Sequence, residues 1–194
     1  MRQPFILNRP RLCIFLMPTV LLVVGMQNDK CSRCSTVLVP RVNACIRAAQ
    51  TRGWRVVFAL DLHHPRHISF QTETPHCILQ TLGAGMASGL LFGFPGSDLI
   101  VRGVDQHEDS NDAFFISEPS NTYSLLRTML CGGNTRLCLC GASPDGCLEQ
   151  TTLTASLRGY CRGDPIIISD ASYLCQIPAS LVCKDLDHLL ALWD

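Results

Sequence analysis

Two places in the sequence combine residue types that could bind a metal ion or supply a nucleophile. The first is Asp61-Leu62-His63, where a carboxylate and an imidazole two residues apart would point the same way on an extended chain. His76 lies a short way downstream and could add a second imidazole. This donor set suits Zn²⁺ or a similar divalent ion and leaves positions open for water or substrate. Histidines are also common in polar loops, so these three residues are candidate ligands and no more.

The second place is the turn 141–146, which leads into Cys147 at the start of a predicted helix. The dipole and free amides of a helix N-terminus stabilise a thiolate, so we predict that the Cys147 thiol is more acidic than a free cysteine. The backbone amides of Ser143 and Cys147 could also form an oxyanion hole. The alternative is a cysteine that simply packs in the core.

These residues must be positioned by the elements around them. Apolar runs and helical periodicities alternate along the chain, and glycines stand where the helices would end. They predict strands over 19–24, 54–60, 136–140 and 165–169, and helices over 40–52, 121–130 and 147–157. This alternation is typical of an α/β fold, with a parallel sheet between two layers of helices. In such folds the chemistry lies beyond the carboxyl ends of the strands, where both candidate sites fall.

Composition limits what the chain can bind. The 194 residues suit one domain over 19–194, preceded by a basic arm over 1–18. Sixteen basic and sixteen acidic residues cancel, so the charge does not indicate contact with nucleic acid or with an anionic membrane. Charged residues make up only 16%, against a usual ~25%. This low charge and the apolar tail over 174–193 favour contacts with other protein subunits.

The arm carries Arg2, Arg9 and Arg11, and no acidic residue precedes Asp29. That pattern is typical of a mitochondrial targeting segment; the alternative is a basic arm that leads into a buried strand of a cytoplasmic protein. The apolar run 12–26 is too short for a transmembrane helix, and Pro18 interrupts it.

The twelve cysteines suit reduced thiols in a chain with long apolar segments better than a disulfide scaffold. Cys31 and Cys34 have the spacing of half a zinc knuckle, but a second such pair is absent from the sequence.

Five segments, in order, resemble the motifs of the isochorismatase-like cysteine hydrolases, nicotinamidases above all. Residues 23–29 resemble DMQNDF, and residues 61–70 resemble DWHPxxHxSF. Residues 75–77 are similar to WPxHC, 102–114 to KGxxxxxDSYSAF, and 141–155 to GxATDYCVxxTAxDA. The resemblance covers about residues 19–172 and implies a three-layer α/β/α sandwich with a mainly parallel sheet.

The resemblance implies an Asp-Lys-Cys triad beside a zinc held by Asp, His and His. It places the nucleophile at Cys147 and the metal ligands at Asp61, His63 and His76. The catalytic Asp, however, falls at Gly25, which has no side chain to move a proton. General acid–base help of this kind is worth about 100- to 10,000-fold in rate. The catalytic Lys falls at Arg102, which keeps a positive charge but has too high a pKa for proton transfer.

The substrate pocket that the resemblance implies is altered as well. Lys30 stands where the family has an aromatic residue after QND, and Glu73 or Thr74 stands where it has Trp. Asp145 is kept, but the neighbouring Tyr of the family is Gly146. We therefore expect poor recognition of the pyridine ring of nicotinamide.

Two functions remain open. The first is a catalytically impaired hydrolase-fold protein, a pseudoenzyme that serves as a structural or interaction subunit of a larger, mitochondrial assembly, its zinc site vestigial. The second is an active metal-dependent cysteine hydrolase with a rearranged triad, acting on a small amide or ester. Asp29 or Asp145 would then have to serve as the base.

Overall fold

The computed structural model describes residues 18–32, 34–107, 112–114, 125–173, 182–183 and 185–193. The predicted basic arm, apart from Pro18, lies outside the described residues. So do residues 108–111 of the motif that follows Arg102, the first part of the predicted helix over 121–130, and residues 174–181 of the apolar tail.

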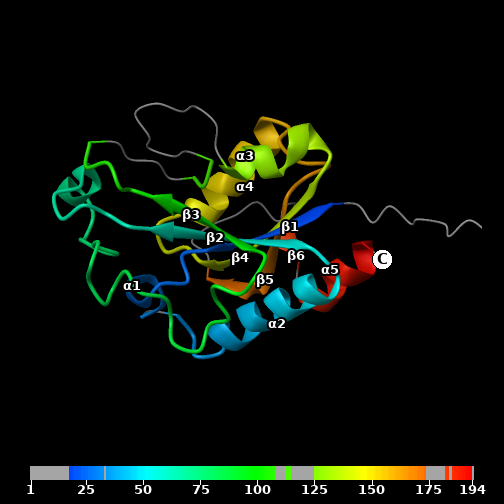
Figure 1. Cartoon of the computed structure of the whole chain (residues 1–194), viewed down its shortest axis with the longest axis horizontal. Helices are drawn as coiled ribbons and strands as arrows, with labels where there is room; N and C mark the ends of the chain where they lie inside the picture. The colour runs from blue at the N-terminus through cyan, green and yellow to red at the C-terminus, as the bar shows by residue number, and fades with distance from the viewer. Residues whose placement is uncertain are drawn as a thin grey trace, which may run out of the picture.

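The described strands form one parallel sheet in the order β3-β2-β1-β4-β5-β6, and the direction of strand order changes beside β1 (Figure 1). Its members are β1 (Thr19–Val24), β2 (Arg55–Asp61), β3 (Ser97–Arg102), β4 (Arg136–Ala142), β5 (Ile166–Tyr173) and the short β6 (Val182–Cys183).

Helices cover both faces of the sheet and give the three predicted layers. Figure 1 shows α2 (Leu38–Thr51) and α5 (Leu186–Trp193) on one face, and α3 (Leu125–Met129) and α4 (Cys147–Leu157) on the other. The one-turn α1 (Asn28–Cys31) follows β1 directly, and two 3₁₀ turns, η1 (Ile68–Gln71) and η2 (Cys131–Gly133), lie in the connections.

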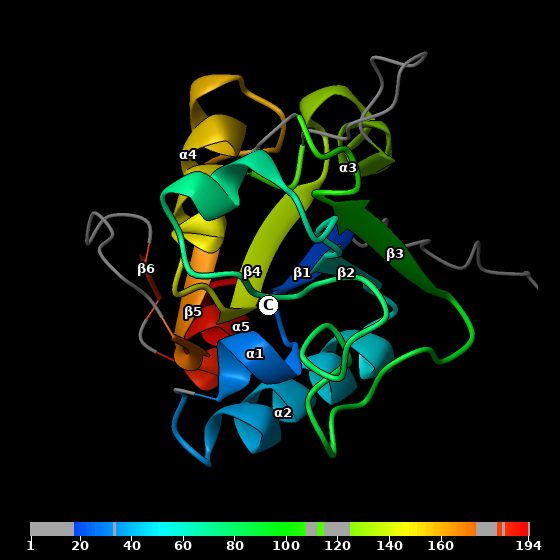
Figure 2. The ribbon, with the colours of Figure 1, turned by 90° about the vertical axis from the view of Figure 1, so that its left-hand side faces the viewer.

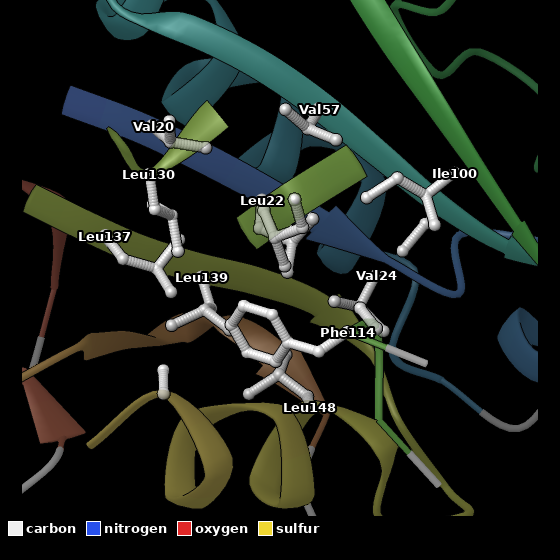
Figure 3. Close-up of a cluster of buried hydrophobic side chains, with 14 of the residues drawn as sticks. Val20, Leu22, Val24, Val57, Ile100, Phe114, Leu130, Leu137, Leu139 and Leu148 are labelled. Atoms are coloured by element: carbon white, nitrogen blue, oxygen red, sulfur yellow. The ribbon is translucent and has the colours of Figure 1, made fainter. Parts of the chain in front are cut away.

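Strand β1 is buried along its whole length because it lies in the middle of the sheet. Successive side chains of a strand point to opposite faces, so β1 contributes to two cores. Val20, Leu22 and Val24 pack on the side of α3 and α4, as Figure 3 shows for part of that cluster. Leu21 and Val23 pack on the side of α2 and α5. A continuous apolar run is what a strand in this position requires.

The predicted elements agree with the structure where hydrophobic runs are long. Strand β1 and helix α4 have the predicted bounds, and β2, β4 and α2 differ from them by one or two residues. Strand β5 continues to Tyr173, four residues beyond the prediction of 169. The edge strand β3 was not predicted, because Asp98 and the half-exposed Leu99 interrupt its apolar pattern.

Part of the apolar tail proves to be α5, which packs on its own sheet through the buried Leu189. Leu192 of the same helix is 59% exposed, so the role of the tail as a contact surface stays a prediction. The eight cysteines whose side chains are described are all free thiols. Within the described residues, no helix combines the length and the apolar character needed to cross a membrane.

Candidate active site

The candidate residues gather at the carboxyl edge of the sheet, around the place where the strand order changes direction. Gly25 follows β1, Asp61 ends β2, Arg102 ends β3, and Cys147 begins α4 just beyond β4. Figure 2 views the molecule from this edge, with α1 in front of the sheet. Open α/β sheets bind ligands at this kind of switch point.

The structure brings Asp61, His63 and His76 together. One candidate ligand atom from each lies within 4.8 Å of the others. The loop holds His76 near His63 because the backbone of His63 donates to the carbonyl of Cys77 and accepts from the amide of Leu79, both at 2.9 Å. The convergence that the sequence predicted is therefore present.

Gly103 permits this approach. A Cβ atom on Gly103 would collide with the ring of His63, and the residue has a φ of +71°. Neither ring nitrogen of His63 has a hydrogen-bond partner within the described residues, although the side chain is buried.

Asp61 lies between two cations. The Lys30 ammonium and the Arg102 guanidinium each form an ion pair with one of its carboxylate oxygens. Asp145 completes the cluster, with Oδ2 at 2.7 Å from Lys30 Nζ and 3.8 Å from Arg102 Nη2. The side chains of Lys30, Asp61 and Arg102 are at most 5% exposed. The two cations and two carboxylates form a closed, formally neutral quartet.

The pKa shifts in this cluster follow from its ion pairs. Burial alone would raise the pKa of the Asp61 carboxyl, but Arg102 and Lys30 hold it well below its usual range. Burial would likewise lower the pKa of Lys30, but Asp61 and Asp145 together hold it above its ordinary value. Burial would lower the pKa of Arg102 as well, but Asp61 holds it above its ordinary value, so Lys30, Asp61 and Arg102 are all charged at neutral pH. Burial lowers the pKa of the His63 imidazole to about 4, so that ring is neutral.

The ligand types at this site suit a zinc ion, whereas the charge around Asp61 does not. Asp61, His63 and His76 are suitable ligands for Zn²⁺, and the unpartnered nitrogens of His63 are consistent with a metal position. The charge does not fit, because both oxygens of Asp61 are already paired with cations. A divalent ion would have to displace Lys30 from Asp61 and enter a buried cluster that is already neutral.

Cys147 begins α4, as predicted, but it is fully buried and its thiol is not acidic. Burial raises the pKa of Cys147 to about 11, although Arg102 and Lys30 act in the opposite direction. The prediction of a lowered pKa is therefore wrong, because desolvation outweighs the nearby cations and the helix N-terminus. The Thr151 hydroxyl, at 3.9 Å from Sγ, is a polar neighbour of the thiol.

Ser143 has a different role from the one predicted. Its amide donates to the carbonyl of Tyr173 at 3.0 Å, so it is not available to an oxyanion. Its hydroxyl donates to Oε2 of Glu149 and accepts from the amide of Leu148, both at 2.8 Å. Ser143 thus ties β4 to β5 and supports the start of α4, and the oxyanion role of the Cys147 amide stays a prediction.

Gly25 lies where the catalytic Asp was expected, and the structure leaves no space for a side chain there. The residue has a φ of +59°, and a Cβ atom would collide with the carbonyl oxygen of Ala142. The same Cβ would lie 2.9 Å from Cδ of Lys30. Sequence reasoning missed that Lys30 enters the site; the only signal was a lysine at a position where the resemblance implies a buried aromatic.

Each of the two alternative bases has one carboxylate oxygen engaged. Oδ2 of Asp29 accepts from the amide of Cys77 at 2.7 Å and so holds the loop before β3. Asp145 is paired with Lys30.

A cavity of about 430 Å³ opens beside the charged cluster. No Phe, Tyr or Trp is among its described lining residues, and neither is Cys147; they are Asp29, Lys30, Ser32, Glu73, Thr74, Pro75, His76, Pro144 and Asp145. Among these described lining residues, Glu73 and Thr74 stand where the resemblance implies Trp.

The Cys31–Cys34 pair does not form a metal centre with other described residues. Asp61, His63 and His76 are the sole group of three or more potential ligands found in the part of the chain that the structure describes. The thiol of Cys34 instead donates to the carbonyl of Lys30 at 3.4 Å.

Comparison with known structures supports the fold. A pyrazinamidase of Pyrococcus horikoshii, solved in complex with zinc, is 24% identical, with a TM-score of 0.64 over 90% of this chain and 92% of that one. A nicotinamidase from Bacillus subtilis is 19% identical, with a TM-score of 0.61 over 91% and 93%. An isochorismatase-like hydrolase from Alkaliphilus metalliredigens is 14% identical, with a TM-score of 0.67 over 91% and 100%.

A comparison with curated protein sequences gives no significant match. A sequence model of one family, described as the Isochorismatase domain, matches residues 19–179. This match spans β1 to β5 and every residue of the candidate site, so the chain belongs to the isochorismatase family.

Proposed function

We propose that this member of the isochorismatase family is catalytically impaired and acts as a structural or interaction subunit rather than as an amidase. One observation carries the proposal: the expected base is Gly25, and the space for its side chain is filled by Lys30 and by the Ala142 carbonyl. The impairment is therefore built into the packing, since a carboxylate cannot be placed there without moving Lys30.

Amide hydrolysis by a cysteine needs a thiolate and a group that protonates the departing amine. The Cys147 thiol, with a pKa of about 11, stays protonated at neutral pH. Lys30 and Arg102 are ion-paired with Asp61 and Asp145, and their pKa values are raised. Neither cation can therefore readily donate a proton to a departing amine. The carboxylates near Cys147, Asp61 and Asp145, are both paired with cations, which makes them weak proton acceptors.

The cavity supports the same proposal. A pyridine or pyrazine ring gains much of its binding energy from apolar and aromatic contact. Here the lining residues are mostly polar or charged, and Glu73 and Thr74 take the place of the expected Trp. A weakly bound ring would not reach a nucleophile that is itself 0% exposed.

Zinc enters this proposal only as a vestige. Asp61, His63 and His76 are the residues that would hold it, and a bound ion would supply a Lewis acid beside the cavity. The pairing of Asp61 with Lys30 and Arg102 supports a site that no longer binds the ion.

The subunit role and a mitochondrial location are supported by composition. A charged fraction of 16% and the acid-free, arginine-bearing arm before Asp29 motivate them. Gel filtration of the native protein from its source tests the assembly, with a mass near 21.4 kDa contradicting it. A fluorescent protein fused to residues 1–18 tests targeting, with diffuse cytoplasmic signal as the contradicting result.

Turnover is the direct test of impairment. Purified full-length protein, with and without Zn²⁺, is assayed for ammonia release from nicotinamide and pyrazinamide beside a nicotinamidase as positive control. We expect background rates that do not change in Cys147→Ala. Ammonia release above background that Cys147→Ala abolishes would overturn the proposal.

An active hydrolase with a rearranged triad is the second candidate. The convergence of Asp61, His63 and His76 beside a 430 Å³ cavity favours it, with Asp145 as the nearest alternative base. Panels of small amides and esters test this candidate. Turnover lost in both Cys147→Ala and Asp145→Asn would support it.

A further inference from the structure

Lys30 is paired with one of the three residues that a metal ion would need. The Lys30 ammonium contacts Oδ2 of Asp61, and Asp61 is one of the three candidate metal ligands, with His63 and His76. The Lys30 side chain is 1% exposed, so the contact belongs to the interior and is not a surface ion pair.

We propose that the Lys30 ammonium is a built-in cation that replaces the divalent ion at Asp61, His63 and His76. The chain therefore folds with this site complete and metal-free, and removal of the Lys30 charge converts the site into a divalent-metal site. The proposal concerns which cation Asp61 takes and does not depend on whether Cys147 is active.

The backbone places Lys30 firmly. It lies in α1, whose first turn is tied to the loop before β3: the Asn28 amide donates to the Gly85 carbonyl at 2.8 Å, and the Asp29 amide to the Gly83 carbonyl at 3.0 Å. The Cys34 thiol donates to the Lys30 carbonyl at 3.4 Å. Lys30 is thus directed into the site by contacts on both sides of it in the sequence.

Gly25 supplies the room for the Lys30 side chain. The stem of Lys30 passes Gly25 closely enough that a Cβ there would lie 2.9 Å from Lys30 Cδ. Any larger residue at position 25 would compete with Lys30 for the same space. The glycine and the buried lysine therefore form one structural unit.

Charge decides which cation stays. The buried Lys30, Arg102 and Asp61 form a quartet without net charge together with Asp145, whose side chain is 19% exposed. Adding a divalent ion would leave two uncompensated positive charges in a desolvated place, which is strongly unfavourable. Without the Lys30 charge the cluster carries one net negative charge, and a divalent ion then gains Asp61 together with one unpartnered nitrogen of His63.

The experiment measures metal affinity rather than turnover. Co²⁺ is titrated into full-length wild type, Lys30→Met, Lys30→Gln, His76→Ala and Lys30→Met/His76→Ala, with binding followed by visible absorption and by the thermal midpoint. Thiolate-to-cobalt bands in the near ultraviolet identify Co²⁺ that is bound by cysteine, and this binding is distinguished from binding at the histidine site.

We expect Lys30→Met or Lys30→Gln to bind Co²⁺ at the histidine site at least ~100-fold more tightly than wild type, since removal of a nearby buried charge is worth several kcal/mol. Co²⁺ should raise the thermal midpoint of these variants but not that of wild type or of Lys30→Met/His76→Ala. Equal affinity in wild type and in a folded Lys30 variant would overturn the proposal.

Wild type alone decides the matter if neither Lys30 variant folds. Weak Co²⁺ binding that His76→Ala leaves unchanged supports the built-in cation. Tight binding that His76→Ala abolishes overturns it. Turnover in the amide assay would contradict the proposed function but would not change how the Co²⁺ affinities are interpreted.

Discussion

The side chain of Lys30 lies in the space toward which a side chain on Gly25 would project, with Cδ of Lys30 2.9 Å from the position of a Cβ on Gly25. The two residues come from different elements, the turn after β1 and helix α1, yet their side-chain volumes exclude each other. The missing base and the buried lysine are thus one feature of the packing rather than two separate substitutions.

Gly25→Asp alone should not create amidase activity, and it should lower the stability of the protein. A non-glycine residue at a φ of +59° beside the Ala142 carbonyl is strained, at a cost of about 1–3 kcal/mol. Arg102 and Lys30 would also pair with the new carboxylate and keep it from acting as a base. Ammonia release from nicotinamide and urea unfolding measure the two effects.

Gly25→Ala is the matched control, because it adds the same Cβ without the carboxylate. It should lose a similar amount of stability. Robust turnover by Gly25→Asp alone would show that the pocket and the proton-transfer groups are intact.

Cys147 should resist alkylation in the folded protein. Its side chain is 0% exposed and its pKa is about 11, against about 8.5 for a free thiol, so little thiolate exists at neutral pH. Iodoacetamide labelling between pH 6 and 10, read by peptide mass spectrometry, should show slow modification that still rises at the highest pH. In urea, the labelling rate of the same peptide should rise with pH around the pKa of a free thiol. A labelling rate of the folded protein that is already constant above about pH 7 would mean an activated cysteine.

Stability should fall on the alkaline side, partly because of the same thiol. The folded chain holds the Cys147 proton up to about pH 11, whereas the unfolded chain releases it above about pH 8.5. The contribution of Cys147 to the free energy of unfolding is therefore complete below about pH 8.5. It declines toward pH 11 by at most about 1.4 kcal/mol per pH unit.

Urea unfolding under reducing conditions at pH 7, 9 and 10.5 measures that slope. Burial raises the pKa of Cys138, and a hydrogen bond with Cys45 together with burial raises that of Cys140. Burial also raises the pKa values of Cys31, Cys77 and Cys161, so all these thiols contribute to the wild-type slope. Cys147→Ala should have a shallower slope than wild type, and an unchanged slope would contradict the raised pKa of Cys147.

Arg102→Met should destabilise the fold by about 3–5 kcal/mol, because it removes one partner of a buried ion pair and leaves the Asp61 carboxylate with Lys30 alone. Arg102→Lys should cost less, since it keeps the charge and loses only the forked geometry of the guanidinium. Denaturant unfolding of both variants gives the comparison.

Arg55→Met is the control for this prediction. Arg55 pairs with Asp98 at 2.5 Å, but its side chain is 50% exposed, and an exposed pair contributes at most about 1 kcal/mol. Equal losses for Arg102→Met and Arg55→Met would mean that burial does not strengthen the Arg102–Asp61 pair.

The sequence by itself determined the layers of the fold and the placement of most candidate site residues. Continuous apolar runs such as 19–24 can only be satisfied in the middle of a sheet, and a parallel sheet brings the ends of its strands to one edge. That is why Asp61 and Cys147 could be assigned to strand ends, and why β3, half-exposed at the sheet edge, was missed.

Only the tertiary structure decided the electrostatics of the site. That Lys30 reaches Asp61 depends on how the turn after Gly25 and the loop before β3 fold back on each other, and local sequence does not encode such a contact. The pKa of Cys147 likewise depends on desolvation, which is a property of everything packed around the thiol. Residue types and spacing fix which groups can meet; the packing fixes which charges they face and whether water reaches them.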